Sequence, residues 1–214
     1  MTRGTMTTIF LVRHGATEWN IDKRAQGHAD IDLNAEGHRQ AVSAAQELSH
    51  LEIDAVYSSD LKRATDTAAP IASAHGLEVK TDKRFREIDQ GDWEGLTVDE
   101  IMAKWPDLWG PARHYNARPG GESPQQVRDR SLEALRDVVA AHPDRSVVVV
   151  SHGGTIRWLS AEALGYDEYR SRRIRGLGNG AIVALKAHLD DGALVLDELH
   201  RLDGNTTDLD DPND

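Results

Sequence analysis

The stretch Ile9-Phe10-Leu11-Val12-Arg13-His14-Gly15-Ala16 is the most informative feature of this chain, because an apolar strand in it ends directly on an arginine and a histidine. A second stretch, Val147-Val148-Val149-Val150-Ser151-His152-Gly153-Gly154, has the same form. In open α/β sheets, ligands bind outside the carboxyl ends of the strands. Two histidines that follow two strands, with arginines nearby to bind an anion, indicate phosphoryl chemistry through a histidine.

Apolar strands and amphipathic helices alternate along the chain. Runs rich in Val and Ile predict strands over 8–13, 54–58, 78–80, 146–151, 181–186 and 193–200. Capping residues and apolar spacings of three and four predict helices that begin after Asn34, cover 61–74, run from Thr97 to about Lys104, begin at Ser123, and cover 155–164. This order predicts an α/β fold in which a largely parallel sheet is covered by helices on both faces.

The composition limits the class of protein and its partners. The chain has 214 residues, a net charge of −11 and no cysteine. This length fits a single domain, which we place over 1–202, and the missing cysteines exclude disulfides, thiolate catalysis and Cys-based zinc sites. The acidic balance argues against nucleic acid as a partner. With no long apolar run and no apolar leader, we expect a cytoplasmic protein that binds no membrane.

Two segments differ from the rest of the chain. Residues 203–214 carry five aspartates and no lysine or arginine, which predicts an acidic tail without fixed structure. Residues 104–121 contain three prolines, several glycines, Trp105, Trp109 and Tyr115, which favours either a lid-like insertion or a surface loop pinned by its aromatic side chains. The sequence leaves open which early methionine starts the native chain, and it leaves open the oligomeric state, with a homodimer as one option.

Candidate residues for phosphate chemistry lie at the predicted strand ends. Arg13 and Arg63 are expected to bind the phosphoryl group, because guanidinium binds phosphate oxygens with two parallel hydrogen bonds and keeps its charge. His14 is the candidate nucleophile, since a neutral imidazole can attack phosphorus and leave again. His152 opens a glycine-rich helix start and is expected to contact the phosphoryl oxygens together with that helix N-terminus.

A proton donor for the leaving group is expected in the segment 86–95. This segment offers four carboxylates, and spacing alone does not choose among Glu87, Asp89, Asp92 and Glu94. A carboxylic acid beside a bound phosphate keeps its proton more readily because of like-charge repulsion, which suits a general acid. Two histidines are also compatible with a metal site, but the chain has no H-E-x-x-H motif and no EF-hand loop, so we expect no metal.

Over about residues 8 to 200, the chain resembles the histidine phosphatase superfamily, also called the phosphoglycerate mutase-like proteins. The first stretch continues as Arg13-His14-Gly15-Ala16-Thr17-Glu18-Trp19-Asn20, which matches the family signature R-H-G-x-T-x-x-N. Four more elements follow in the order of the family: Gln26-Gly27-His28-Ala29-Asp30-Ile31-Asp32-Leu33, Ser58-Ser59-Asp60-Leu61-Lys62-Arg63, Pro119-Gly120-Gly121-Glu122-Ser123 and Ser151-His152-Gly153-Gly154.

The resemblance implies a role for each site residue. It implies that His14 becomes phosphorylated and that Glu87 is the proton donor. It implies that the phosphoryl group is held by Arg13, Arg63 and His152, and that the phosphate pocket is lined by Asn20, Gln26, Gly27 and Gly153. The implied fold is a three-layer α/β/α sandwich around a mixed, mostly parallel sheet of about six strands, with no metal and no organic cofactor.

The segment Glu87-Ile88-Asp89-Gln90-Gly91-Asp92-Trp93-Glu94-Gly95-Leu96 resembles the phosphatase branch of the family. We therefore predict a metal-independent phosphomonoesterase that acts on a small phosphorylated metabolite. The alternatives are a cofactor-dependent phosphoglycerate mutase and a non-catalytic protein that binds phosphorylated ligands. Selectivity among substrates is expected from the rim of the phosphate pocket, formed either by 105–118 or by the arginine-rich run 169–175. That run is either a solvated basic face or a binding site for a carboxylate of the substrate.

Overall fold

Strand β1 (Thr7–Arg13) lies inside the sheet because its side chains are apolar on both faces. Ile9 and Leu11 pack into one core, and Phe10 and Val12 pack into the other. Such a strand, buried on both sides, is typical of sheets with helices on both faces. The computed structural model describes residues 6–109, 116–167, 170–174 and 177–202, without the side chains of residues 172 and 173.

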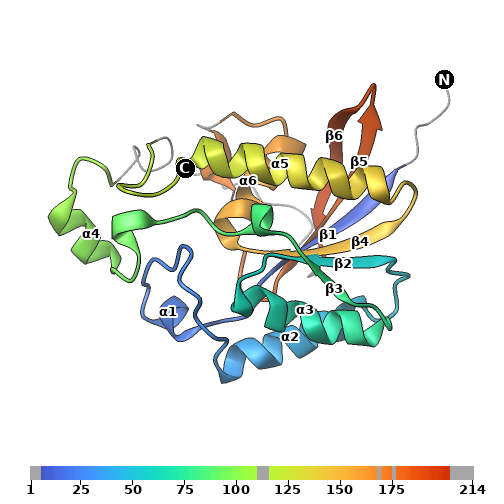
Figure 1. Ribbon diagram of the computed structural model, residues 1–214, viewed down its shortest axis with the longest axis horizontal. Coiled ribbons are helices and arrows are strands. Elements are labelled where there is room, and N and C mark those ends of the chain that lie inside the picture. The colour runs from blue at the N-terminus through green and yellow to red at the C-terminus, as the bar shows by residue number, and fades with distance from the viewer. Residues whose placement is uncertain (1–5, 110–115, 168–169, 175–176, 203–214) are drawn as a thin grey trace.

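Six strands form one mixed sheet in the order β3-β2-β4-β1-β5-β6 (Figure 1). Four of them run parallel, and β5 and β6 form an antiparallel hairpin on β1. The bounds are β2 (Ala55–Ser58), β3 (Val79–Thr81), β4 (Ser146–Ser151), β5 (Ile182–Asp190) and β6 (Ala193–Arg201). The predicted mixed, mostly parallel sheet is therefore confirmed.

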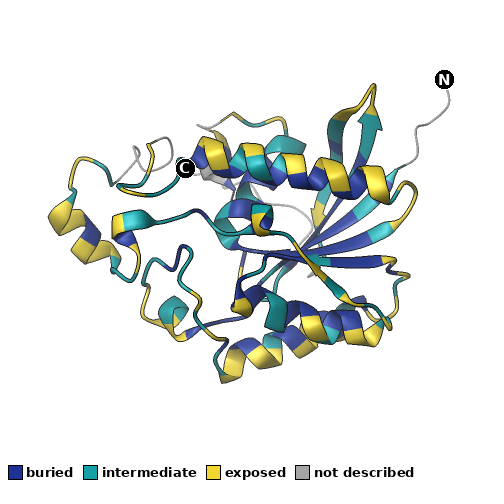
Figure 2. Cartoon of the chain, in the orientation of Figure 1, coloured by how far each residue is buried: buried dark blue, intermediate teal, exposed yellow. Residues whose placement is uncertain are grey.

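Two pairs of helices cover the two faces of the sheet (Figure 1). Helices α2 (Ala35–Leu48) and α3 (Lys62–Ala74) pack on the Phe10 side, and α5 (Pro124–Ala141) and α6 (Gly153–Ala163) pack on the Ile9 side. In these helices the buried residues lie on the side toward the sheet and the exposed residues lie on the outer side (Figure 2). This is the predicted three-layer arrangement.

Helix starts follow the predicted caps. Asn34, Thr97 and Ser123 each accept a hydrogen bond on the side chain from the third backbone N–H of the helix that follows. Helix α4 (Val98–Lys104) ends at the predicted lysine. Helix α6 begins at Gly153, two residues earlier than predicted, because the backbone of His152 already serves as its cap.

Short elements that the sequence analysis did not predict lie near the carboxyl edge of the sheet. They are α1 (Glu18–Ile21) and the 3-10 turns Lys83–Phe85 and Gly91–Trp93. Helix α1 has a reciprocal capping box in which Thr17 and Asn20 bond to each other's backbone. These short turns lack the apolar periodicity that identifies longer helices.

Several predicted features fall outside the described residues: the acidic tail, residues 110–115 of the lid-like insertion, and Tyr169 and Arg175 of the arginine-rich run. Within the described chain, no helix combines the length and the apolarity needed to cross a membrane.

Candidate active site

Strand register brings the predicted site residues to one edge of the sheet. Arg13, the last residue of β1, is paired with Ser151, the last residue of β4, and Val150 is paired with Ser58, the last residue of β2. The residues that follow these strand ends therefore lie next to each other. The His14 amide donates to the Ser151 carbonyl at 2.9 Å, which continues the ladder past the end of β1.

His14 has the geometry of a nucleophile. Its side chain is buried, and its Nδ1 lies 2.7 Å from the Gly15 carbonyl oxygen. Because a carbonyl only accepts, Nδ1 carries the proton and the neutral ring keeps a lone pair on Nε2. Burial, and next the charges of Arg63 and Arg13, lower the pKa of His14 well below 6.5, although the bond to Gly15 opposes this shift. The imidazole is therefore neutral at physiological pH.

His152 lies beside His14, with the ring centroids 5.1 Å apart. It is fully buried, and neither ring nitrogen has a hydrogen-bond partner among the described residues. Buried polar groups are normally paired, so this orphaned ring points to a partner that arrives with a ligand. Burial, followed by the charges of Arg63 and His14, lowers the pKa of His152 well below its ordinary value.

Arg63 is a fully buried guanidinium in the first turn of α3. Nη1 donates to the Ala29 carbonyl at 2.6 Å and Nη2 donates to the Gly27 carbonyl at 2.8 Å, whereas Nε has no acceptor among the described residues. Burial lowers the pKa of Arg63 to about 10, and the nearby Glu87 opposes that shift. The side chain keeps its positive charge at neutral pH.

Arg13 supplies a second cation at the end of β1. Its Nη1 donates to the Leu177 carbonyl, and its buried Nε has no acceptor among the described residues. A Cβ at Gly153 would lie 3.3 Å from that Nε, so the start of α6 packs closely against the guanidinium. Burial lowers the pKa of Arg13, and Glu87 again opposes the shift.

Glu87 differs from the other three carboxylates of its segment by the groups it faces. It interacts with both Arg13 and Arg63, and its Oε2 accepts from the Gly154 amide of α6 at 3.0 Å. Glu94 instead accepts from the amides of His28 and Ala29, both at 2.8 Å.

The remaining two carboxylates of the segment also lie in local structure. Asp89 accepts from the Gly91 amide at 2.9 Å. Asp92 lies beside Gly120, where an added Cβ would be 3.3 Å from its carboxylate oxygen. Among the four carboxylates, Glu87 is the one that interacts with both Arg13 and Arg63.

The predicted pocket-lining residues have distinct surroundings. Asn20 accepts on Oδ1 from Thr17 and, at 3.2 Å, from Asn179. The Oε1 atom of the buried Gln26 has no donor among the described residues. Gly27 adopts a φ of +51°, and a Cβ there would lie 2.8 Å from the Gln90 amide nitrogen, so glycine is required at this position.

Two further residues, which the sequence analysis missed, hold the site in place. Asn179 donates to the His14 carbonyl at 3.0 Å and to Asn20, so it joins the end of β1 to α1. Arg130 of α5 donates to the carbonyls of Arg84, Arg86 and Glu87 and to both carboxylate oxygens of Glu122. Glu122 lies in the motif Pro119-Gly120-Gly121-Glu122-Ser123, but no local sequence pattern indicates that Arg130 is its partner.

The collected groups have the charge and the hydrogen-bonding atoms that an anion requires. Arg13 and Arg63 supply positive charge, the unpaired ring of His152 supplies hydrogen-bonding atoms, and the N-terminus of α6 adds its dipole. Within the described residues no group of three or more His, Cys, Asp or Glu side chains is placed to hold a metal ion.

Comparisons with known proteins show the family of this chain. The family model of the histidine phosphatase superfamily (branch 1) matches residues 9–198. A glucosyl-3-phosphoglycerate phosphatase of Mycolicibacterium vanbaalenii is 40% identical over 190 residues, which are 84% of this chain and 84% of that protein. Phosphoserine phosphatase 1 of Hydrogenobacter thermophilus is 42% identical over 165 residues, covering 76% of this chain and 78% of that protein.

A solved structure supports the same assignment. A mycobacterial glucosyl-3-phosphoglycerate phosphatase in complex with VO3 superimposes with a TM-score of 0.81 at 36% identity, and the match covers 90% of this chain and 96% of that chain. These matches confirm the predicted family, the phosphoglycerate mutase-like fold and the enzyme class, a phosphoric monoester hydrolase. The chain belongs to branch 1 of the histidine phosphatase superfamily.

Proposed function

We propose that this protein hydrolyses a small phosphorylated metabolite through a phosphohistidine on His14, without a metal ion. The hydrogen bond from His14 Nδ1 to the Gly15 carbonyl carries the proposal, because it directs the lone pair of Nε2 away from the backbone. The lowered pKa of His14 keeps that lone pair available. A buried, neutral and oriented imidazole is what nucleophilic attack on phosphorus requires.

The phosphoryl group is bound by the cations around His14. Arg13 and Arg63 neutralise the equatorial oxygens, and the N–H groups at the start of α6 contribute their dipole. In this arrangement the two arginines take the part that metal ions play in other phosphoryl-transfer enzymes. The unpaired ring of His152 becomes hydrogen-bonded when the phosphoryl group enters.

The reaction then proceeds by two displacements. In the first, Nε2 of His14 forms a bond to phosphorus as the ester P–O bond breaks, and protonated Glu87 gives its proton to the leaving alkoxide. In the second, water attacks phosphorus, Glu87 takes up the proton of that water, and the P–N bond breaks to release inorganic phosphate. The same carboxyl group serves as acid and then as base, which restores the free enzyme.

The substrate is proposed to carry a carboxylate on its alcohol part. The named substrates of both curated relatives, glucosyl-3-phosphoglycerate and phosphoserine, share that feature. The arginine-rich run, one of two rim candidates, is predicted to be either a solvated basic face or a binding site for the carboxylate, and Arg175 and the side chains of Arg172 and Arg173 lie outside the described residues. The substrate class therefore rests on the relatives and on the sequence.

A steady-state assay with and without a chelator tests this function. We expect release of inorganic phosphate from phosphate monoesters, unchanged by excess chelator and abolished in His14→Ala. Activity that is lost in chelator and restored by a divalent ion would overturn the metal-free mechanism. Interconversion of phosphoglycerates faster than their hydrolysis, dependent on a bisphosphorylated primer, would identify a mutase instead. Binding of esters without any turnover would identify a non-catalytic binding protein.

A further inference from the structure

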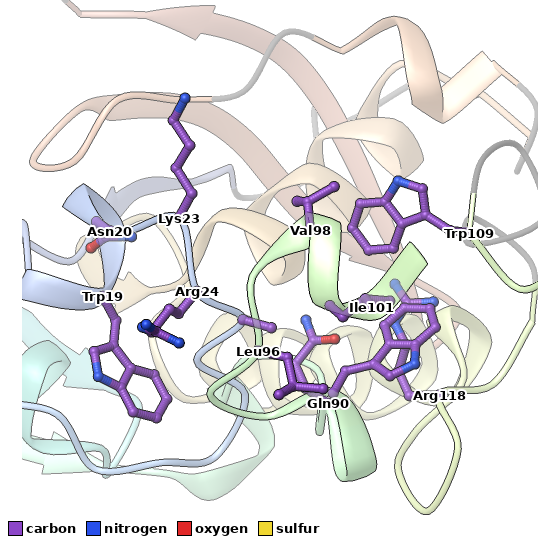
Figure 3. A pocket seen from close by; sticks show the side chains of 12 residues that line it. Trp19, Asn20, Lys23, Arg24, Gln90, Leu96, Val98, Ile101, Trp109 and Arg118 are labelled. Atoms are coloured by element: carbon purple, nitrogen blue, oxygen red, sulfur yellow. The ribbon is translucent and has the colours of Figure 1, made fainter. Parts of the chain in front are cut away.

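Four of the five tryptophans of the chain gather next to the phosphate site. Trp19, Trp93 and Trp109 line a cavity of about 430 Å³, and the ring centroid of Trp105 lies 6.5 Å from that of Trp93. In Figure 3, Trp19 and Trp109 stand on opposite sides of the cavity, with Arg24 and Leu96 between them. Tryptophans far apart in the sequence thus form one aromatic site, which the phosphoryl chemistry described above does not use.

Two residues that line the cavity are in contact with residues of the phosphate site. Asn20, one of its lining residues, is hydrogen-bonded to Asn179, which also donates to the carbonyl of His14. Gln90, another lining residue, packs against Gly27, whose carbonyl accepts from Arg63. The side of the phosphate site formed by Asn20 and Gly27 is therefore shared with, or in contact with, the lining of this cavity.

Seven of the twelve lining residues are apolar or aromatic, and none of the described residues that line the cavity is a carboxylate. Ala25, Leu96, Val98 and Ile101 complete the apolar part. Asn20 and Gln90 are its uncharged polar members, and Lys23, Arg24 and Arg118 are its charged members. Arg24 lies 3.7 Å from carboxylate oxygens of both Asp22 and Glu100, and these two ion pairs offset its positive charge. Ile21 and Met102 are exposed apolar residues on α1 and α4, the two helices that also carry lining residues of the cavity. Such a cavity favours a ring over a small polar chain.

We infer that this aromatic cavity binds the alcohol part of the substrate and selects phosphate esters that carry a sugar ring. The inference rests on the proposed function and specifies its substrate class. One face of a sugar ring presents C–H groups, which pack well against the electron-rich face of an indole. A three-carbon alcohol such as glycerate or serine would leave most of a 430 Å³ cavity filled with water. Between the substrates named for the relatives, the cavity fits the glucosylated one.

Two substrates test this inference because they differ only in the ring. Glucosyl-3-phosphoglycerate carries the sugar, and 3-phosphoglycerate is the same acid without it. We expect the parent protein to prefer the glucosylated ester by about tenfold in kcat/KM, since an aromatic contact of this kind contributes on the order of one factor of ten. Trp109→Ala should remove that preference by raising KM for the glucosylated ester, with a much smaller change for 3-phosphoglycerate. Trp109→Phe should retain most of the preference.

Leu108→Ala is the matched control, because Leu108 precedes Trp109 in the same segment and does not line the cavity. It should leave the preference unchanged, which separates loss of the indole from disturbance of the segment. Equal kcat/KM for the two esters in the parent protein, or an unchanged preference in Trp109→Ala, would overturn the inference while the phosphatase function stands. Absence of hydrolysis of both esters and of aryl phosphates would instead overturn the proposed function itself.

Discussion

Glu87 is held by the backbone of Gly154, whose amide donates to Oε2 at 3.0 Å. Gly154 is the second residue of α6, the helix that begins immediately after His152. The proposed proton donor and the imidazole beside the nucleophile are therefore fixed by the same helix start. A Cβ at Gly154 would lie 2.3 Å from Oε1 of Glu87, so the site tolerates only glycine if the carboxyl group is to stay in place.

Gly154→Ala should therefore displace the carboxyl group and lower kcat for alkyl phosphates by about a hundredfold, since small misplacements cost that much in catalysis. The thermal midpoint should change little, because a flexible side chain yields rather than the backbone. Gly178→Ala is the control, as an added Cβ there meets nothing within 4 Å. Steady-state kinetics and a thermal melt check both proteins. An alanine variant with parental kcat would show that Glu87 need not occupy this position.

Glu87→Gln tests whether the carboxyl group donates a proton. Aryl phosphates leave without much help, whereas alkyl phosphates need a proton on the leaving oxygen. General acid catalysis contributes about two to four orders of magnitude, so kcat for alkyl esters should fall by about that factor and kcat for aryl esters should fall far less. Equal slowing of both ester types would assign Glu87 a positioning role and return Asp89 and Asp92 to consideration.

Arg130 should act on catalysis through the segment that carries Glu87. Its guanidinium contacts the carbonyls of Arg84, Arg86 and Glu87, as well as Glu122, a set of acceptors that a lysine ammonium cannot match. We expect Arg130→Lys to lower kcat for alkyl esters by about tenfold with little change in KM. In a Glu87→Gln background the same substitution should have no further effect on the ratio of alkyl to aryl rates. Independent, additive effects would refute the positioning role.

A double-mutant cycle of Arg130→Lys and Glu122→Gln measures the coupling free energy between these two side chains. Burial alone would raise the pKa of Glu122, but the hydrogen bonds from Arg130 and from the Asp89 amide lower it. Residues in one network of this kind typically couple by about 0.5–3 kcal/mol. Urea unfolding of the parent, both single variants and the double variant should give a coupling free energy in that range. A coupling near zero would mean that the two side chains stabilise the fold separately.

The two buried imidazoles should titrate at unusually low pH. Burial and the charges of Arg63 and Arg13 lower the pKa of His14, so its neutral form persists below 6.5. Below that pH the unfolded chain binds protons that the folded site rejects, so the site contributes stability that is lost as the pH falls from about 6.5. NMR titration of the ring C–H signals, assigned with His152→Gln and His14→Ala, checks this directly. Titration of the folded His14 near its ordinary value would contradict it.

The fold was predictable because its signals are local. Alternating runs of Val and Ile mark the strands, and caps such as Asn34 and Ser123 mark helix starts within a few residues of the positions they bond. The strand-end histidines were predictable for the same reason, since an apolar run followed by His-Gly places the side chain at the carboxyl edge of a parallel sheet. The family resemblance then supplied the role of Glu87, which spacing had left among four carboxylates.

The parts that could not be predicted depend on contacts between distant segments. Asn179 is separated from His14 by 165 positions and Arg130 from Glu87 by 43, and neither residue stands in a local pattern that indicates its partner. The tryptophan cavity is similar, because Trp19, Trp93 and Trp109 share no periodicity and meet only when α1 and the segment after Glu87 fold together. The one sequence signal for this cavity was the proline-rich segment 105–118, which is predicted as one candidate for the rim and which supplies Trp109 and Arg118.

Rapid quenching of single turnovers tests whether a phosphohistidine forms on His14. An ester labelled in its phosphoryl group is mixed with excess enzyme, stopped within the first turnover, digested and mapped. We expect a transient, acid-labile label on the peptide that contains His14, formed and lost at rates compatible with kcat. It should form more slowly from alkyl esters in Glu87→Gln and should be absent in His14→Ala. Full turnover without any covalent label, or a label on another residue that survives in His14→Ala, would contradict the phosphohistidine mechanism.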